Sequence, residues 1–208
     1  MTLQGADFPT LSSMGKSGRS ATREFLFEVA LDQFRSHGFL GTTHADIAAA
    51  AGIGRTTFYE YFSSTEDLLV QLVEAKLPEI VEEMVSGYPA DLSPRDHLAT
   101  LTIRMIEFVG TDHLGLILHT GMQRLSEEAQ SRISAAHIGL TQSFGAVYRA
   151  GMESGDFSKL PTPLVGRLIN EVIMAAGRTV MDSEDPKQQV HEIAESATRF
   201  LIAGLTVH

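Results

Sequence analysis

The sequence predicts an all-α fold in which a small three-helix head precedes a larger all-helical tail. Apolar residues recur at three- and four-residue spacing through most of the chain, which is the period of an amphipathic helix, and no segment reads as a credible strand. Glycine and proline cluster between these periodic segments, where they end one helix before the next begins. We expect a flexible arm over residues 1–18, the head over 19–79 and the tail over 80–208.

Composition excludes several classes of function. The 208 residues are 43% apolar, enough to fill a core, and contain no cysteine, which excludes disulfides, thiolate nucleophiles and thiolate metal sites. No apolar run is long enough to cross a membrane, and residues 1–18 are polar, unlike a signal peptide, so we expect a soluble, cytoplasmic protein. The net charge of −10 is uneven: residues 1–62 carry −1 and the remainder −9.

The first helix is predicted from Thr22 to Gly38. Residues 1–18 are rich in Gly, Ser and Thr without helical period, so Lys16 falls in the arm and Arg19 at its base. One face of the helix then carries Leu26, Phe27, Ala30, Leu31 and Phe34.

Two short helices follow, joined by a glycine turn. Thr43 and Asp46 have the spacing of a capping box, which opens a second helix of about two turns. The segment 52–54, Gly-Ile-Gly, ends it, and a third short helix spans Arg55 to Phe62.

A fourth, longer helix is predicted to run from Ser64 toward Gly87. Ser64 and Asp67 repeat the capping-box spacing, and Pro78 should kink the helix and is a candidate hinge. In the tail we expect helical stretches at about 94–111, 112–123, 126–153, 161–183 and 186–206.

Two short helices joined by a tight turn, with a helix on each side, are the helix-turn-helix arrangement, which presents its second helix to the major groove of DNA. Placing Phe58 and Phe62 in the core turns Arg55, Thr56, Tyr59 and Glu60 outward and leaves Thr57 and Tyr61 at the margins. Arginine can bind guanine, threonine can meet bases, and tyrosine can hydrogen-bond phosphates. The free amides beside Thr43 and His44 would hold another phosphate.

These residues carry a resemblance to a known family. The stretch 42–62, TTHADIAAAAGIGRTTFYEYF, followed by Glu66-Asp67-Leu68-Leu69, closely resembles the DNA-binding head of the tetracycline-repressor (TetR) family, over about residues 22–73. The resemblance implies an all-helical homodimer, with the last two helices of each chain in a four-helix bundle and a ligand cavity in each tail. The positions that commonly face DNA in the family are Thr43, His44, Arg55, Thr56, Thr57, Tyr59 and Tyr61.

The chain departs from the family pattern at the DNA-facing surface. Thr65 stands where the family usually has a phosphate-binding lysine, Gly54 replaces a stronger cap, and Glu60 adds a negative charge. We therefore expect weaker nonspecific affinity and a gentler salt dependence. Thr65, Lys16 and Arg19 complete the candidate DNA contacts, with insertion of the arm into the minor groove left open.

The tail supplies candidate ligand-binding residues, although most residues of this kind are plain core. Long, flexible apolar side chains suit an adaptable cavity, and His119 with Gln123, four residues on, is the preferred polar pair. The candidates are Met84, Met105, Phe108, His119, Met122, Gln123, Phe144, Tyr148 and Met174. The histidines do not stand at a metal-binding spacing, so no metal or cofactor is expected.

Apolar stripes on the last two helices predict a dimer interface, although they could instead face the chain's own core. Small residues around Ala175-Ala176-Gly177, which permit close helix approach, favour the dimer. The stripe residues are Leu164, Leu168, Val172, Ala175, Ile193, Ala197, Phe200, Leu201 and Leu205.

The sequence thus predicts a sequence-specific transcriptional regulator, not an enzyme: a homodimeric repressor that a small apolar or amphipathic effector releases from a pseudo-palindromic double-stranded DNA operator. Two alternatives stay open. One is a DNA-binding dimer that senses no ligand, and the other is an all-α module that binds something other than DNA. No nucleophile motif, phosphate loop or metal cluster predicts a catalytic residue.

Overall fold

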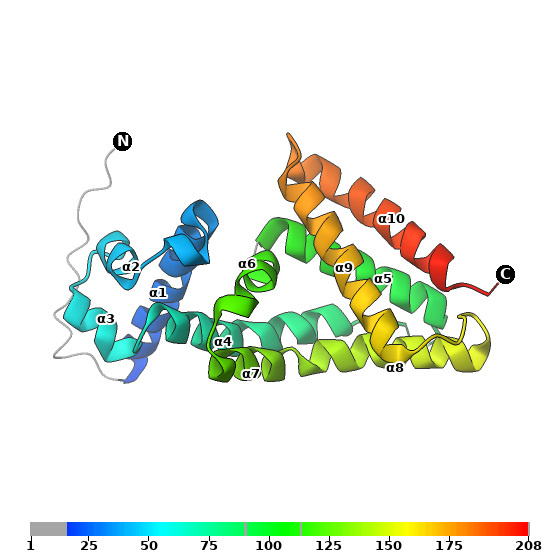
Figure 1. The fold of residues 1–208 in the computed structure, drawn as a ribbon, viewed down its shortest axis with the longest axis horizontal. Helices are drawn as coiled ribbons and strands as arrows, with labels where there is room; N and C mark the ends of the chain where they lie inside the picture. The colour runs from blue at the N-terminus through cyan, green and yellow to red at the C-terminus, as the bar shows by residue number, and fades with distance from the viewer. Residues whose placement is uncertain (1–15, 90, 113, 208) are drawn as a thin grey trace. The chain divides into compact units, whose positions relative to one another are not determined.

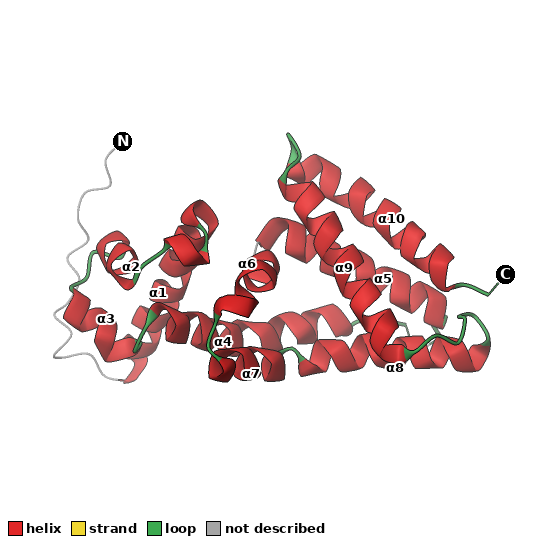
Figure 2. Ribbon diagram, viewed as in Figure 1, coloured by secondary structure: helices red, strands yellow, loops and turns green. Residues whose placement is uncertain are grey.

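The computed structural model describes residues 16–89, 91–112 and 114–207, which form ten α-helices and two short 3-10 helices (Figures 1 and 2). Within these ranges the only β-type pairing is an isolated bridge between Phe157 and Thr206, so the predicted all-α class is confirmed. The chain divides into two compact units, one ending at Leu69 and the other beginning at Val70. The division falls inside a helix, earlier than the expected boundary between residues 79 and 80.

The first unit holds the helices of the predicted head. These are α1 (Lys16–His37), η2 (Phe39–Gly41), α2 (His44–Ala50), α3 (Arg55–Tyr61) and the first turn of α4 (Thr65–Val85).

Helix α1 begins at Lys16, earlier than the predicted Thr22, so Lys16 and Arg19 lie on a helix and not on an arm. The prediction relied on apolar periodicity, which residues 16–21 lack in sequence, but polar residues also take part in helices. The rest of the expected arm, residues 1–15, lies outside the described residues.

Aromatic rings hold the head together. Phe27 of α1 and Phe58 of α3 each approach Phe62, with 5.6 Å between ring centroids, and all three side chains are buried with Leu26 and Ile47. Burying each such side chain contributes about 1.5–3 kcal/mol. This packing determines which side of α3 faces outward.

Local hydrogen bonds set the start of α2. The Asp46 amide donates to Thr43 Oγ1 at 3.3 Å, and the Thr43 amide donates to Asp46 Oδ2 at 2.9 Å, which is the predicted capping box. Gly52 then adopts φ +68°, a left-handed conformation that glycine allows at little cost, and turns the chain into α3.

Local hydrogen bonds also set the start of α4. The Asp67 amide donates to Ser64 Oγ at 3.0 Å, and the Asp67 carboxylate accepts from the Ser63 amide at 2.8 Å. Helix α4 then continues on both sides of Pro78.

The second unit contains the rest of α4 and all later helices. These are α5 (Pro94–Asp112), α6 (Leu114–Gly121), η3 (Met122–Arg124), α7 (Glu127–Ala136), α8 (Ile138–Ser154), α9 (Thr162–Met181) and α10 (Pro186–Leu205). Helices α5, α9 and α10 pack against one another around the larger core.

The predicted single stretch over 126–153 is two helices, α7 and α8, which meet at His137. His137 caps α7 through a backbone N–H bond to the Ile133 carbonyl at 3.2 Å, while its own carbonyl accepts from Thr141 at 3.1 Å to open α8. The nearby Gly139 falls inside α8 and not at the break, so sequence punctuation did not reveal it.

Helices α5 and α9 approach closely because glycines face branched side chains. A Cβ built on Gly177 would lie 2.5 Å from Val109 Cγ1, and one on Gly110 would lie 2.9 Å from Val180. Gly177, one of the small residues predicted to favour the dimer interface, therefore serves packing within the chain.

An arginine from α5 closes the C-terminal end of α4. Arg104 donates to the carbonyls of Met84 at 3.2 Å and Ser86 at 3.0 Å, and its guanidinium lies 4.6 Å from the Tyr88 ring centroid. The Met84 carbonyl belongs to the last turn of α4, where the helix dipole favours a cation.

Candidate functional site

The α2–α3 surface presents polar side chains to solvent. Arg55, Thr56 and Tyr59 of α3 are exposed, and Thr57 and Tyr61 are half-buried, which is the distribution that the sequence led us to expect. Thr43 is exposed, and His44 and Thr65 are half-buried.

A contact between the two helices positions Tyr59. Its hydroxyl lies 3.1 Å from Nε2 of His44 at the start of α2, and the two ring centroids are 5.1 Å apart. The sequence placed both residues on the surface but did not predict this pair. Because the pair ties α3 to α2, the outward hydroxyl of Tyr59 is held in place.

The α2–α3 surface carries little charge. Arg55 is the only lysine or arginine between residues 44 and 61, and the exposed Glu60 adds a negative charge to α3. Hydrogen bonds from the side chain and the backbone of Thr43 hold the pKa of Asp46 below its ordinary value. The Asp46 carboxylate is therefore engaged in the helix cap, and the surface offers hydrogen-bond donors more than net positive charge.

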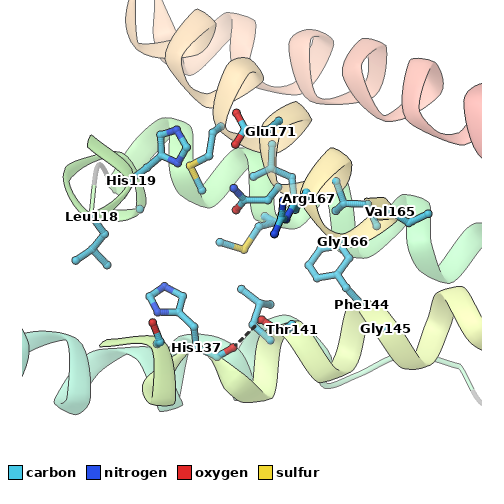
Figure 3. A pocket seen from close by; sticks show the side chains of 18 of the residues that line it. Leu118, His119, His137, Thr141, Phe144, Gly145, Val165, Gly166, Arg167 and Glu171 are labelled. Atoms are coloured by element: carbon cyan, nitrogen blue, oxygen red, sulfur yellow. Dashed lines mark hydrogen bonds between the residues drawn. The ribbon is translucent and has the colours of Figure 1, made fainter. Parts of the chain in front are cut away.

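The second unit contains a cavity of about 670 Å³. Its walls come from α4, α5, α6, η3, α7, α8 and α9, and Figure 3 shows side chains of several of these helices pointing into it. The volume lies within the roughly 300–1,000 Å³ typical of ligand pockets.

Most of the expected ligand residues line this cavity. The lining ones are Met105, Phe108, His119, Met122, Phe144, Tyr148 and Met174. Met84 and Gln123 are not among its walls: Met84 packs against the core of the second unit, and Gln123 is exposed in η3. The preferred pair of His119 and Gln123 is therefore divided, because residue 123 belongs to a 3-10 turn and no longer follows the α-helical spacing.

The cavity is apolar inside and polar at its rim. Its buried walls include Leu118, Ile133, Ile169 and Ile173, whereas the exposed lining residues include Arg167. The other exposed polar ones are Ser134, Thr141, Asn170 and Glu171. This division suits an amphipathic molecule.

Tyr148 contributes only its ring to the cavity. Its hydroxyl donates to the Ser158 carbonyl at 2.8 Å and accepts from the Leu160 amide at 3.0 Å. Both bonds hold the loop after α8, so the hydroxyl is already satisfied.

Sequence analysis missed several polar lining residues, above all His137, Thr141 and Arg167. A signal existed for the first two, because His137, Thr141, Phe144 and Tyr148 continue one stripe at three- and four-residue spacing. No such signal marks Arg167, whose role depends on how α9 crosses the other helices (Figure 3).

Helices α9 and α10 also leave large apolar side chains uncovered. Leu164, Leu168 and Phe200 are 47%, 45% and 74% exposed. Leu201 and Leu205, expected in the same interface, are only 5% and 3% exposed and belong to the chain's own core. The remaining expected residues lie between these extremes: Val172, Ile193 and Ala197 are half-buried, and Ala175 is exposed.

Neither a candidate metal site nor a candidate membrane span is found in the described ranges. No group of three or more His, Asp or Glu side chains is placed there to hold a metal ion. Nor does any helix within those ranges combine the length and hydropathy of a membrane span.

Comparisons with known proteins agree with this architecture. Residues 26–72 match the model of the bacterial regulatory proteins of the tetR family. The chain is 20% identical to the fatty acid metabolism regulator protein of Bacillus subtilis, over 86% of this chain and 93% of that protein. It is 25% identical to the HTH-type transcriptional repressor KstR2 of Rhodococcus jostii, over 82% of this chain and 83% of the relative.

A solved structure shares the fold. The transcriptional regulator FadR from Bacillus subtilis, in complex with stearoyl-CoA, superposes with a TM-score of 0.72 at 20% identity, covering 90% of this chain and 100% of that one.

Proposed function

Because the chain belongs to the TetR family and is a DNA-binding transcriptional regulator rather than an enzyme, we propose that it is a repressor released from its operator by an amphipathic effector. The observation that carries the proposal is the pairing of a donor-rich α2–α3 surface in one unit with a large apolar cavity in the other. We place its action in the cytoplasm, where the operator DNA lies.

On DNA, α3 enters the major groove. Arg55, on its first turn, reads guanine O6 and N7, and Thr56 and Thr57 contact bases or the thymine methyl group. Tyr59 and Tyr61 bond phosphates, and the free amides at the start of α2, beside Thr43, hold another. With a single cation on these two helices, the fit of hydrogen-bond donors supplies more of the affinity than net charge does.

The cavity binds a ligand with a long apolar body and a polar head. Its buried walls accept the body, and its exposed rim leaves the head near solvent. Two relatives support this class: one is named for fatty acid metabolism, and the FadR structure holds stearoyl-CoA. Ligand-independent DNA binding, the alternative left open above, would leave this cavity without a role.

Two copies act together. Regulators of this family act as dimers, and the exposed Leu164, Leu168 and Phe200 offer an apolar surface for the mate. Two heads would bind half-sites about 34–36 Å apart on a pseudo-palindromic operator. A ligand that binds better when the heads are spaced differently shifts the dimer away from DNA.

The test is titration of a DNA fragment, selected from a random pool by this chain, with stearoyl-CoA as probe. We expect a sequence-specific complex that the probe dissociates. A chain that selects no sequence is not such a regulator, and one that stays on DNA at saturating probe, with the probe bound, is not released by this ligand class.

A further inference from the structure

His137, which the sequence did not single out, is held in one orientation at the cavity wall. Its Nδ1 lies 2.8 Å from the carbonyl oxygen of Ile133, one turn earlier in α7. A carbonyl only accepts hydrogen bonds, so Nδ1 carries a proton and donates it. The other ring nitrogen, Nε2, is left for a partner in the cavity.

The orientation of His137 restricts what that partner can be. A neutral His137 offers a lone pair at Nε2, which an ester or ketone oxygen cannot satisfy because both atoms are acceptors. A charged His137 offers an N–H group at Nε2, from which an anion accepts a charge-assisted hydrogen bond. The site therefore favours an acidic group over a neutral carbonyl.

The surrounding side chains favour the same choice. Figure 3 shows His137 and Thr141 on one wall, with His119 and Arg167 on the facing helices α6 and α9. His119 and Arg167 can both donate hydrogen bonds to an anion. Glu171 is the one carboxylate among the lining residues, and it follows Arg167 by four positions on the exposed side of α9.

We infer that the cavity selects ligands with an anionic head group, which hydrogen-bonds to Nε2 of His137 with Arg167 on the facing wall. This inference rests on the proposed function, since it names the chemistry of the effector's polar end. The anion can be the carboxylate of a free acid or a phosphate of a coenzyme A thioester, and both would use the same donors.

Three probes with the same apolar chain test the inference: stearate, stearyl alcohol and stearoyl-CoA. Their dissociation constants are measured on the full chain by calorimetry. We expect at least one anionic probe to bind about tenfold or more tightly than the alcohol, which is the scale of one charge-assisted hydrogen bond. Preference for stearate identifies a carboxylate subsite, and preference for stearoyl-CoA alone identifies a phosphate subsite.

Two substitutions at His137 provide matched variants. In His137→Asn the amide can still donate to Ile133, but the atom equivalent to Nε2 is lost, whereas His137→Gln places an amide N–H close to the Nε2 position. We expect the asparagine variant to lose the preference for an anion and the glutamine variant to keep part of it. Both variants should unfold in urea at the same midpoint as the wild type, which controls for misfolding.

The possible failures are distinguishable. If all three probes bind the wild type with similar constants, or if His137→Asn keeps the full preference, the head-group inference is wrong while the sensing function stands. If no probe binds at all, the proposed effector class is wrong, and the inference fails with it.

Discussion

Arg55 carries the clearest single-residue prediction. It is the only lysine or arginine on α2 or α3, and it is exposed on the first turn of α3. Arg55→Gln should weaken specific DNA binding by about 1–3 kcal/mol, which is the discrimination of one bidentate contact to guanine. Fluorescence anisotropy with the selected operator measures it, and Arg95→Gln, which removes an exposed charge at the start of α5, should have no effect. Equal losses of DNA affinity in both variants would mean that Arg55 contributes only general positive charge and no base-specific contact.

Glu60 gives a prediction of opposite sign. This exposed carboxylate lies on the proposed DNA-facing side of α3, where it would repel phosphates. Glu60→Gln should tighten binding to operator and to unrelated DNA by similar factors, since a phosphate effect carries no sequence information. Binding to both DNAs, measured over a salt series, checks this. An unchanged affinity for both would place Glu60 away from the backbone.

Asp46 makes the stability of the head depend on pH. Its pKa lies below the ordinary value of 3.8, chiefly because the Thr43 side chain hydrogen-bonds to the carboxylate. The unfolded chain therefore binds a proton more readily, so this stabilisation is full at neutral pH and is lost as the pH falls below about 3.8. Thermal melts should show wild type above Asp46→Asn at pH 7, with the gap closing in acid. A gap that does not change with pH would contradict the assignment.

At the scale of the helices, glycine spacing decides how closely α5 and α9 pack. Gly177→Ala should destabilise the protein by about 1–3 kcal/mol, because its methyl group would meet Val109. Gly166→Ala is the matched control in the same helix: a Cβ there has nothing within 4 Å, so alanine should stabilise by about 0.5–1 kcal/mol. Urea unfolding measures both, and the same sign for both variants would contradict the packing.

An ion pair connects the cavity wall to α4. Arg132 of α7 forms two hydrogen bonds with the Glu74 carboxylate, at 2.8 and 2.6 Å, and the next residue, Ile133, lines the cavity. Because both side chains are 39% exposed, the pair contributes at most about 1 kcal/mol to stability. Arg132→Gln should nevertheless reduce the ligand-induced loss of DNA affinity severalfold.

That effect on coupling is separable from effects on binding. Affinity of the Arg132→Gln variant for DNA alone and for ligand alone should stay within about twofold of wild type. Should the variant lose either affinity and keep normal release, the ion pair would not transmit the signal.

Sequence patterns predicted the helices and turns well where capping residues, glycines or apolar periodicity mark their ends and faces. The Thr43–Asp46 cap, the turn at Gly52 and the outward face of α3 follow from residue types and helical period, and all appear in the structure. The break at His137 was missed because the cap is made by the histidine itself, through its side chain and backbone. Local chemistry therefore determined what could be predicted at this scale.

The cavity and the exposed apolar face depend on the whole molecule. A stripe of apolar residues on α10 has the same sequence pattern whether it faces the core or a partner. Phe200 and Leu201 were therefore predicted together for the interface, but Phe200 is exposed and Leu201 is buried. Arg167 likewise lies at the rim of the cavity because of how α9 packs among the other helices, which its local sequence does not indicate. Such assignments need the packed structure.

Association of two copies should depend on that uncovered face. Phe200→Glu should yield monomers in sedimentation, because it places a charge in an apolar interface, and it should weaken operator binding by breaking the pairing of heads. Ile138→Glu, which changes an exposed apolar residue on α8, is the control and should leave the dimer intact. A Phe200→Glu variant that still sediments as a dimer would put the interface elsewhere.

The most direct test of the whole account is operator selection from a random DNA pool, run with wild type and with the Arg55→Ala, Tyr59→Ala double variant. The account predicts that wild type enriches a two-fold-symmetric sequence, with half-sites about one helical turn apart, and that the double variant enriches none. Enrichment of the same sequence by the double variant, or of no sequence by wild type, would contradict the claim that α3 reads DNA.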